Sequence, residues 1–310
     1  MNIIKPPRLR RGDVIGVCAP AGPILDRIKL DRGIRYLEQL GYQVHLGNHL
    51  YKKMGYLAGT DAERAGDLTE LFADKHVRAV FCARGGYGIQ RILPLLDYKL
   101  IRRNPKIVVG YSDITALQLA LFRKIGLITF AGPMVVGMPD SFSKSTEEMF
   151  WRMLTSILPP EKISATESVL YRGPRTVATG RLVGGNLALV AALVGTPFLP
   201  DMSGTILSLE EIDEQPYRVD RLLQQLDHAG VLSATKGVLL GTFTGCVPDK
   251  GKPSLRLPQI FERAFKANRT PVVSGFRFGH VRRSLTLPIG ANVRIDGTKM
   301  SLQVLDAGVS

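Results

Sequence analysis

The first 135 residues alternate between short apolar runs and amphipathic segments, and this order constrains the fold more than any other feature. We expect strands at residues 13–19, 42–46, 77–83, 106–109 and 127–131, and helices at residues 24–40, 60–72, 88–96 and 115–123. Regular alternation of this kind implies a mostly parallel sheet with helices on both faces. Ligands of such sheets bind at the carboxyl ends of the strands.

The pattern becomes less regular in the second half of the chain. A helix expected near residues 145–158 is ended by Pro159 and Pro160, and a polar stretch follows. Beyond it we expect strands at 180–183, 205–209, 238–243 and 271–273, helices at 216–229 and 257–267, and a hairpin at 291–305. We therefore predict an N-terminal domain (1–158), a linker (159–175) and a smaller mixed α/β domain (176–310).

Composition indicates a folded globular protein, because 45% of the 310 residues are hydrophobic and 22% are charged. The longest apolar run, residues 187–199, is interrupted by Gly195 and Pro197, so no membrane segment is expected. The apolar stretch at 14–19 is too short for a secretory signal. These features predict a cytoplasmic protein without a membrane partner.

Metal-ligating and disulfide patterns are lacking in the sequence. The three cysteines, Cys18, Cys82 and Cys246, are widely separated, and none has a CxxC spacing, which favours buried free thiols. His45 and His49 are four residues apart but have no acidic or cysteine partner nearby in the sequence. We therefore expect no metal site.

The net charge of +14 arises from 41 basic and 27 acidic residues. Such a surplus can indicate nucleic-acid binding, but the basic residues are scattered, and no zinc finger, RNP-type motif or basic helix is present. We expect a soluble enzyme that has a basic surface or takes anionic substrates, and that has no nucleic-acid partner.

Ser112 lies between an expected strand and an expected helix, in Gly110-Tyr111-Ser112-Asp113-Ile114. A serine on such a tight turn resembles the nucleophile elbow of hydrolases, which exposes the hydroxyl at the carboxyl edge of the sheet. A simpler alternative is that Ser112 only caps the helix N-terminus.

A second strand–loop–helix junction contains Arg84-Gly85-Gly86-Tyr87-Gly88. Its glycines leave backbone N–H groups open to an oxyanion beside Ser112 or to a nucleotide phosphate, although a plain tight turn is also possible. The loop is not a Walker loop, and it fails the Gly-x-Gly-x-x-Gly pattern.

The second half offers an acid and a base. Glu210 ends an apolar strand, and His280 lies in a glycine-flanked loop. A solvated acidic turn and an incidental surface histidine are the simpler interpretations. However, a serine needs an adjacent base, and a carboxylate on the other ring nitrogen orients that base. Ser112, Glu210 and His280 are therefore a candidate triad.

A series of motifs running through most of the chain resembles the LD-carboxypeptidase family of serine peptidases, which includes murein tetrapeptide carboxypeptidases and microcin C immunity peptidases. These motifs are Gly12-Asp13-Val14-Ile15 with Ala19-Pro20, Ala83-Arg84-Gly85-Gly86-Tyr87-Gly88, Gly110-Tyr111-Ser112-Asp113-Ile114-Thr115-Ala116-Leu117, Gly132-Pro133-Met134, Gly184-Gly185-Asn186-Leu187, Leu209-Glu210 with Pro216-Tyr217-Arg218, and Gly279-His280 with Leu287-Pro288-Ile289-Gly290.

The resemblance implies a Rossmann-like N-terminal domain, a smaller barrel-like C-terminal domain and an active site between them. It implies that Ser112 is the nucleophile, His280 the general base and acid, and Glu210 the orienting carboxylate. The oxyanion hole would consist of the backbone N–H groups of Gly86 and Asp113. The resemblance also implies a homodimer without a metal or cofactor.

The implied reaction removes the terminal D-alanine from cytoplasmic murein tetrapeptide during peptidoglycan recycling. Arg84 and Tyr87 are candidate substrate-binding residues, because the substrate carries several carboxylates. The chain has no long insertion of the kind found in the microcin-immunity branch, which favours a murein substrate. The alternatives are a microcin C-type peptidyl-nucleotide peptidase and, in a different class, a nucleotide-binding α/β protein.

Overall fold

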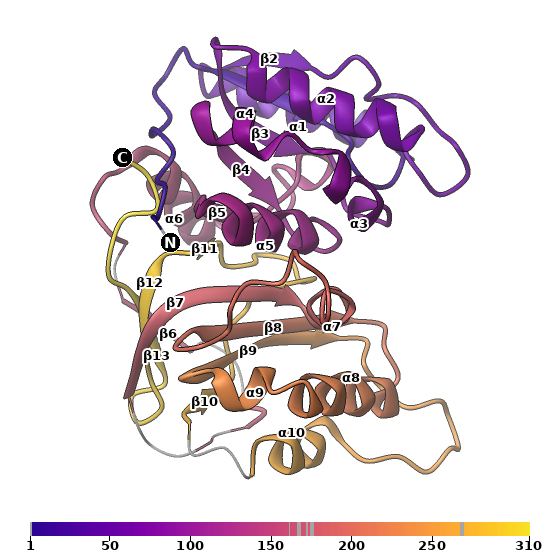
Figure 1. The fold of residues 1–310 in the computed structure, drawn as a ribbon, viewed down its shortest axis with the longest axis vertical. Helices are drawn as coiled ribbons and strands as arrows, with labels where there is room; N and C mark the ends of the chain where they lie inside the picture. Colours follow the sequence, from indigo (N-terminus) through magenta and orange to yellow (C-terminus); the bar gives the residue numbers. More distant parts are fainter. Residues whose placement is uncertain (1, 161, 166–168, 172, 174–176, 267–269) are drawn as a thin grey trace.

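Two β-sheets, each accompanied by helices, form the described part of the chain (Figure 1). The computed structural model describes residues 2–310 except 161, 166–168, 172, 174–176 and 267–269. One sheet is mostly parallel, and the other is mixed and curled into a half-barrel. This architecture confirms the predicted α/β fold class.

The first sheet has the strand order β11-β5-β4-β3-β1-β2. Its strands are β1 (Val14–Cys18), β2 (Gln43–Leu46), β3 (Val77–Cys82), β4 (Ile107–Gly110), β5 (Thr129–Ala131) and the antiparallel β11 (Leu287–Ile289). Helices of this half are α1 (Arg27–Gln39), α2 (Asp61–Ala73), α3 (Ile89–Ile92), α4 (Tyr98–Arg103), α5 (Ile114–Ile125) and α6 (Lys144–Thr155), with 3-10 turns η1 (Leu93–Leu95) and η2 (Val135–Gly137).

The second sheet has the order β10-β9-β8-β7-β12-β13-β6. Its strands are β7 (Val177–Asn186), β8 (Ile206–Ile212), β9 (Gly237–Thr244) and β10 (Val272–Val273), all parallel, and the antiparallel β12 (Asn292–Asp296), β13 (Ser301–Val304) and β6 (Ile163–Ser164). Its helices are α7 (Leu187–Ala192), α8 (Pro216–His228), α9 (Val231–Ala234) and α10 (Leu257–Phe265).

Two strands do not follow the division into two domains and a linker that the sequence predicts. Strand β6 lies within residues 159–175, and β11 returns to the first sheet from the second half. The alternation of apolar and polar residues does not predict β11, because Pro288 stands at the centre of this strand. A proline is tolerated there because β11 is an edge strand. The domain boundaries themselves remain a prediction.

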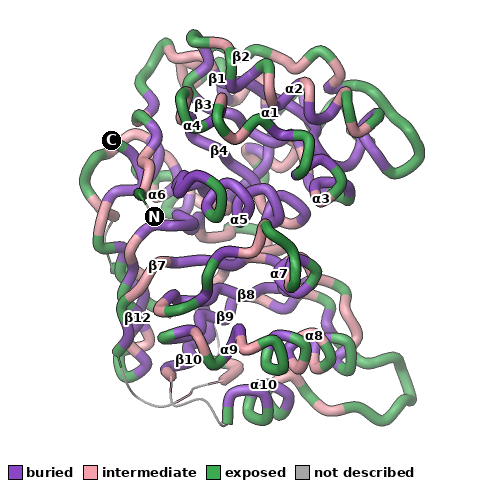
Figure 2. The backbone as a smooth tube through the Cα atoms, in the orientation of Figure 1, coloured by how far each residue is buried: buried purple, intermediate pink, exposed green. Residues whose placement is uncertain are grey.

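Helix α5 lies between the two sheets and is buried along almost its whole length (Figures 1 and 2). Its apolar residues are distributed around the helix rather than along one stripe, as expected for a helix covered on both sides. The strands form the buried centre of each half, and exposed residues concentrate on the outer helices and loops (Figure 2). Cys18, Cys82 and Cys246 are buried and free, as predicted.

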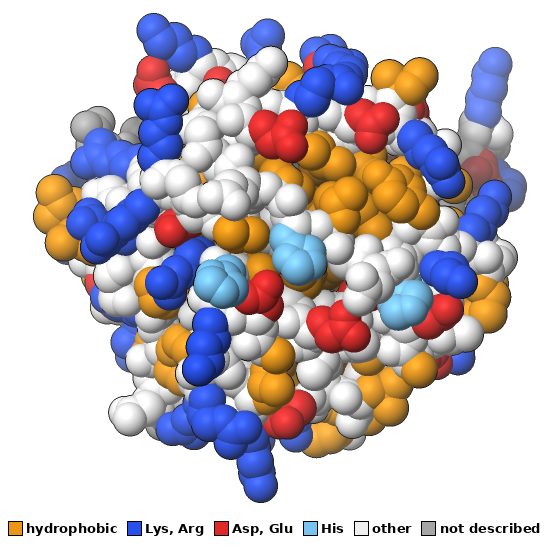
Figure 3. Space-filling model, turned by 90° about the horizontal axis from the view of Figure 1, so that it is seen from above, with side chains coloured by type: hydrophobic (Ala, Val, Ile, Leu, Met, Phe, Trp, Pro, Cys, Tyr) orange, Lys and Arg blue, Asp and Glu red, His pale blue; other side chains and the backbone are white. Residues whose placement is uncertain are grey.

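The surface carries the basic surplus in a dispersed form. On the face shown in Figure 3, Lys and Arg side chains surround a centre that contains acidic, histidine and hydrophobic side chains. Among the described residues, no helix combines the length and the apolar character needed to cross a bilayer.

Two helical glycines allow a test of this packing. A Cβ at Gly66 of α2 would have no neighbour within 4 Å, whereas a Cβ at Gly33 of α1 would collide with the Val135 carbonyl of η2. We expect Gly66→Ala to raise the free energy of unfolding by about 0.5–1 kcal/mol. Gly33→Ala should lower it by about 1–3 kcal/mol. Urea unfolding monitored by circular dichroism measures both, and equal shifts would contradict the α1–η2 contact.

Candidate active site

Ser112 occupies a tight turn between β4 and α5. Its φ of +67° lies in the left-handed region, which is uncommon for a residue with a side chain and typical of a strained strand-to-helix turn. Helix α5 begins at Ile114 with Asp113 as its N-cap residue, and no side-chain hydrogen bond caps it. The alternative role of Ser112 as a helix cap is therefore not what the structure shows.

The glycine loop after β3 lies directly against Ser112. A Cβ at Gly85 would lie 2.9 Å from Ser112 Cβ and 3.0 Å from Ser112 Oγ, so only glycine permits this approach. Gly86 has a φ of +119° and is packed equally closely against Gly22, from the loop after β1. Within the described residues, the N–H groups of Gly86 and Asp113 donate no hydrogen bond, which leaves both available to an oxyanion.

Glu210 and His280 form a close pair in the second half. His280 Nδ1 lies 2.8 Å from Glu210 Oε2, and their side chains are only 13% and 3% exposed. Gly279, with a φ of +103°, lies against the carboxylate where a Cβ would collide with Glu210 Oε2. The His280 carbonyl accepts a hydrogen bond of 2.9 Å from Thr244 Oγ1 at the end of β9, which fixes the loop.

Tyr111 brings this pair next to the nucleophile turn. Its ring meets the His280 ring edge-on, with centroids 5.0 Å apart, and Ser112 is the next residue. Burial, and secondarily the charge of Glu210, raise the pKa of Tyr111. No hydrogen bond joins Ser112 to His280 among the described contacts; catalytic hydrogen bonds often tighten only when substrate binds.

The acidic stretch at the end of β8 is not simply a solvated turn, because its first two carboxylates lie within the strand and are buried. Glu211 was not singled out in the sequence, yet it accepts hydrogen bonds from Asn186 Nδ2 (2.6 Å), the Ala188 N–H (2.8 Å) and the Ile212 N–H (2.9 Å). Burial raises the pKa of Glu211 despite these hydrogen bonds. Its three partners make Glu211 an anchor for the start of α7.

The two candidate substrate-binding residues are placed at the glycine loop. Arg84 Nη1 donates a hydrogen bond of 2.9 Å to the Pro23 carbonyl. Tyr87 is 48% exposed and packs edge-on against Tyr56, with ring centroids 5.5 Å apart. No recorded contact joins either residue to Glu210 or His280, so their role in substrate binding remains a prediction.

Together these groups have the chemistry of acyl transfer. A serine on a strained turn can attack a carbonyl, a carboxylate-paired histidine can take and return its proton, and two N–H groups can bind an oxyanion. The sequence patterns do not assign Tyr111 to this site, although its place directly before Ser112 is a signal that points to it.

Comparison with known proteins identifies two family domains. Residues 15–132 match the model described as the LD-carboxypeptidase N-terminal domain, and residues 179–295 match the LD-carboxypeptidase C-terminal domain. Ser112 falls within the first match, and Glu210 and His280 fall within the second.

Whole-chain relatives agree with this assignment. A probable murein peptide carboxypeptidase of Bacillus subtilis is 43% identical over 99% of this chain and 95% of its own. MccF in complex with glutamyl sulfamoyl guanosine has a TM-score of 0.89 and 27% identity, with 99% of each chain covered. Muramoyltetrapeptide carboxypeptidase from Oxalobacter formigenes has a TM-score of 0.82 and 32% identity, covering 94% of this chain and 97% of that one. The chain therefore belongs to the LD-carboxypeptidase family, and it is a peptidase and hence a hydrolase.

Proposed function

We propose that this LD-carboxypeptidase removes the terminal D-alanine of cytoplasmic murein tetrapeptide during peptidoglycan recycling, with Ser112, His280 and Glu210 as its triad. The observation that supports this most is the largely buried His280–Glu210 pair, whose histidine ring meets Tyr111, the residue before Ser112 with its positive φ. The names of the Bacillus and Oxalobacter relatives support the murein substrate.

In the first half of the reaction, Ser112 Oγ attacks the scissile carbonyl carbon, and His280 Nε2 takes the hydroxyl proton. Glu210 accepts the hydrogen bond from His280 Nδ1–H and stabilises the imidazolium. The N–H groups of Gly86 and Asp113 bind the oxyanion of the tetrahedral intermediate. Its collapse breaks the C–N bond, and His280 returns the proton to the amine of D-alanine.

In the second half, water attacks the ester that joins the tripeptide to Ser112. His280 takes the proton of this water and then gives it to Ser112 Oγ as the ester bond breaks. The tripeptide leaves with a new carboxylate, and the enzyme returns to its starting state. Each step uses only the triad, the two backbone donors and water.

A peptidyl-nucleotide substrate is the second candidate, because MccF has the higher TM-score of the two structures described above. The structure of that complex contains glutamyl sulfamoyl guanosine bound to MccF. The proposal also includes a homodimer and no nucleic-acid partner. Size-exclusion chromatography with light scattering would measure the oligomeric state.

The test compares murein tetrapeptides that end in D-alanine or L-alanine, and follows release of the terminal residue by mass spectrometry. We expect the wild type to release D-alanine, with turnover reduced by about 10⁴-fold or more in Ser112→Ala. Release of glutamate from glutamyl sulfamoyl guanosine, without release of D-alanine from the tetrapeptide, would favour the second candidate. Equal release by the wild type and Ser112→Ala would contradict the proposed nucleophile.

Adjacent carboxylates provide a matched pair of variants. Glu210→Gln removes the charge that orients His280, and we expect kcat to fall by about 10³–10⁴-fold with little change in folding. Glu211→Gln should lower the free energy of unfolding by about 1–3 kcal/mol, because an amide cannot accept all three hydrogen bonds. Steady-state kinetics and thermal unfolding separate these effects, and the reverse pattern would assign the orienting role to Glu211.

A further inference from the structure

Helix α2 contains a buried cation that the proposed reaction steps do not use. The side chain of Arg64 is fully buried, and the residue is only 1% exposed. A charge at such a site is costly unless it is paired and hydrogen-bonded. The partners of Arg64 therefore indicate what the charge holds in place.

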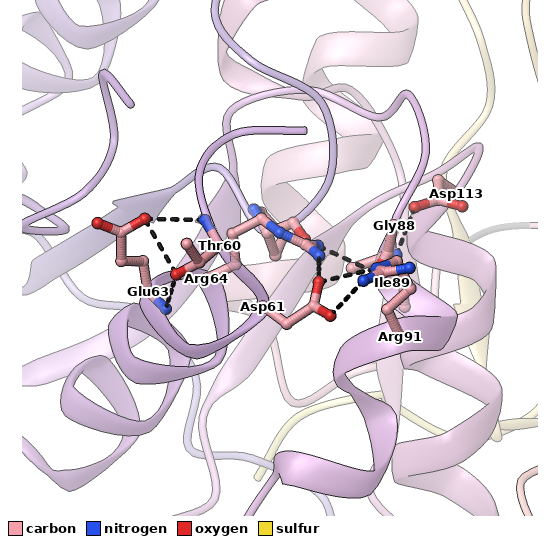
Figure 4. A network of polar contacts seen from close by, with 9 residues as sticks. Thr60, Asp61, Glu63, Arg64, Gly88, Ile89, Arg91 and Asp113 are labelled. Carbon is pink, nitrogen blue, oxygen red and sulfur yellow. Dashed lines mark hydrogen bonds and ion pairs between the residues drawn. The ribbon is translucent and has the colours of Figure 1, made fainter. Parts of the chain in front are cut away.

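The Arg64 guanidinium joins two strand-end loops (Figure 4). Its Nη1 donates to the Pro20 carbonyl at 2.5 Å, in the loop after β1, and to the Gly88 carbonyl at 3.0 Å, at the end of the glycine loop. Its Nη2 pairs with Asp61 of the same helix. A planar fork of donors suits these three partners, whereas the single ammonium of lysine does not.

Loop packing carries this restraint to Gly86. The Gly22 N–H, two residues after Pro20, donates to the Gly85 carbonyl at 3.1 Å, and Gly22 itself touches Gly86. A Cβ at Gly88 would lie only 2.7 Å from Arg64 Nη1, so this end of the loop is pressed against the guanidinium. The loop that carries the Gly86 N–H is thus held at both sides.

Asp113 ties the nucleophile turn to the same loop. Its buried carboxylate accepts a hydrogen bond of 2.9 Å from the Ile89 N–H, the residue after Gly88 (Figure 4). Burial raises the pKa of Asp113 to about 6, while the hydrogen bond from the Ile89 N–H and, to a smaller extent, the charge of Arg64 act in the opposite direction. Asp113, whose own N–H would bind the oxyanion, is therefore fixed by its side chain to the loop that Arg64 holds.

We infer that Arg64 is a positioning residue for the oxyanion hole, because its guanidinium fixes the glycine loop so that the Gly86 N–H meets the oxyanion formed at Ser112. This inference rests on the proposed function. A positioning role predicts a loss in the chemical step, since oxyanion contacts strengthen only as the transition state forms. A purely structural role predicts loss of stability alone.

Three variants test the inference in the full-length protein. Arg64→Met removes the donors, and we expect kcat to fall by about 10²–10³-fold while KM stays within about threefold. Arg64→Lys keeps the charge and should recover part of the activity, to about tenfold below the wild type. Arg91→Met is the matched control: Arg91 is an exposed partner of Asp61, so its loss should leave kcat unchanged.

Hydrogen exchange of the Gly22 and Ile89 amides, which donate to the Gly85 carbonyl and to the Asp113 carboxylate, gives a readout that does not depend on the substrate. We expect exchange there to accelerate by about tenfold in Arg64→Met, with the amides of β4 unchanged. If the wild-type protein released no D-alanine, the proposed function would be contradicted. Hydrogen exchange in the loop would still test whether Arg64 holds the loop in place. The inference would be overturned if Arg64→Met kept the exchange rate and the kcat of the wild type. It would also be overturned if kcat fell only to the extent that the protein unfolds globally. Should Arg64→Met fail to fold, the same readouts on Arg64→Lys decide.

Discussion

Backbone packing at the carboxyl edge of the first sheet is the constraint on which the rest of the site depends. The loops after β1, β3 and β4 approach so closely that Gly22, Gly85 and Gly86 leave no room for a Cβ. The loop after β3 lies against a serine that is held at a φ of +67°, and within the described residues the N–H groups of Gly86 and Asp113 donate no hydrogen bond. Strain of this kind persists only where the surroundings over-determine the backbone, and a buried guanidinium with a buried carboxylate supplies that restraint here.

The second half of the chain contributes the histidine and the carboxylate of the proposed triad from separate segments. Glu210 lies on β8, and His280 follows β10 in a loop whose backbone is bonded to β9. Glu210 and Glu211 are neighbours on one strand, but their carboxylates have different hydrogen-bond partners. The first carboxylate pairs with a histidine whose ring meets Tyr111, whereas the second accepts hydrogen bonds from an amide and two backbone N–H groups. Helix α5, buried between the sheets, connects the nucleophile turn to both halves.

Local patterns in the sequence predict much of this arrangement. The period of apolar residues locates β1 to β5 and their main helices, and the strand–glycine–serine–helix order identifies the Ser112 turn. The same reasoning misses β11, because an edge strand with a central proline lacks a strand pattern. It also leaves Glu211 and Arg64 undistinguished from solvated charges. Burial of a charge is decided by segments distant in sequence, such as Pro20 and Gly88 for Arg64, which no local window contains.

Covalent labelling of Ser112 tests the central claim most directly. A murein tripeptide fluorophosphonate, with phosphorus in place of the scissile carbonyl carbon, would form an Oγ–P bond as the P–F bond breaks and fluoride leaves. Peptide mapping by mass spectrometry should place one label on Ser112 in the wild type, and the rate should fall by about 10³-fold or more in His280→Ala. Labelling of another residue, or equal rates in both proteins, would contradict a nucleophile at the Ser112 turn activated by His280.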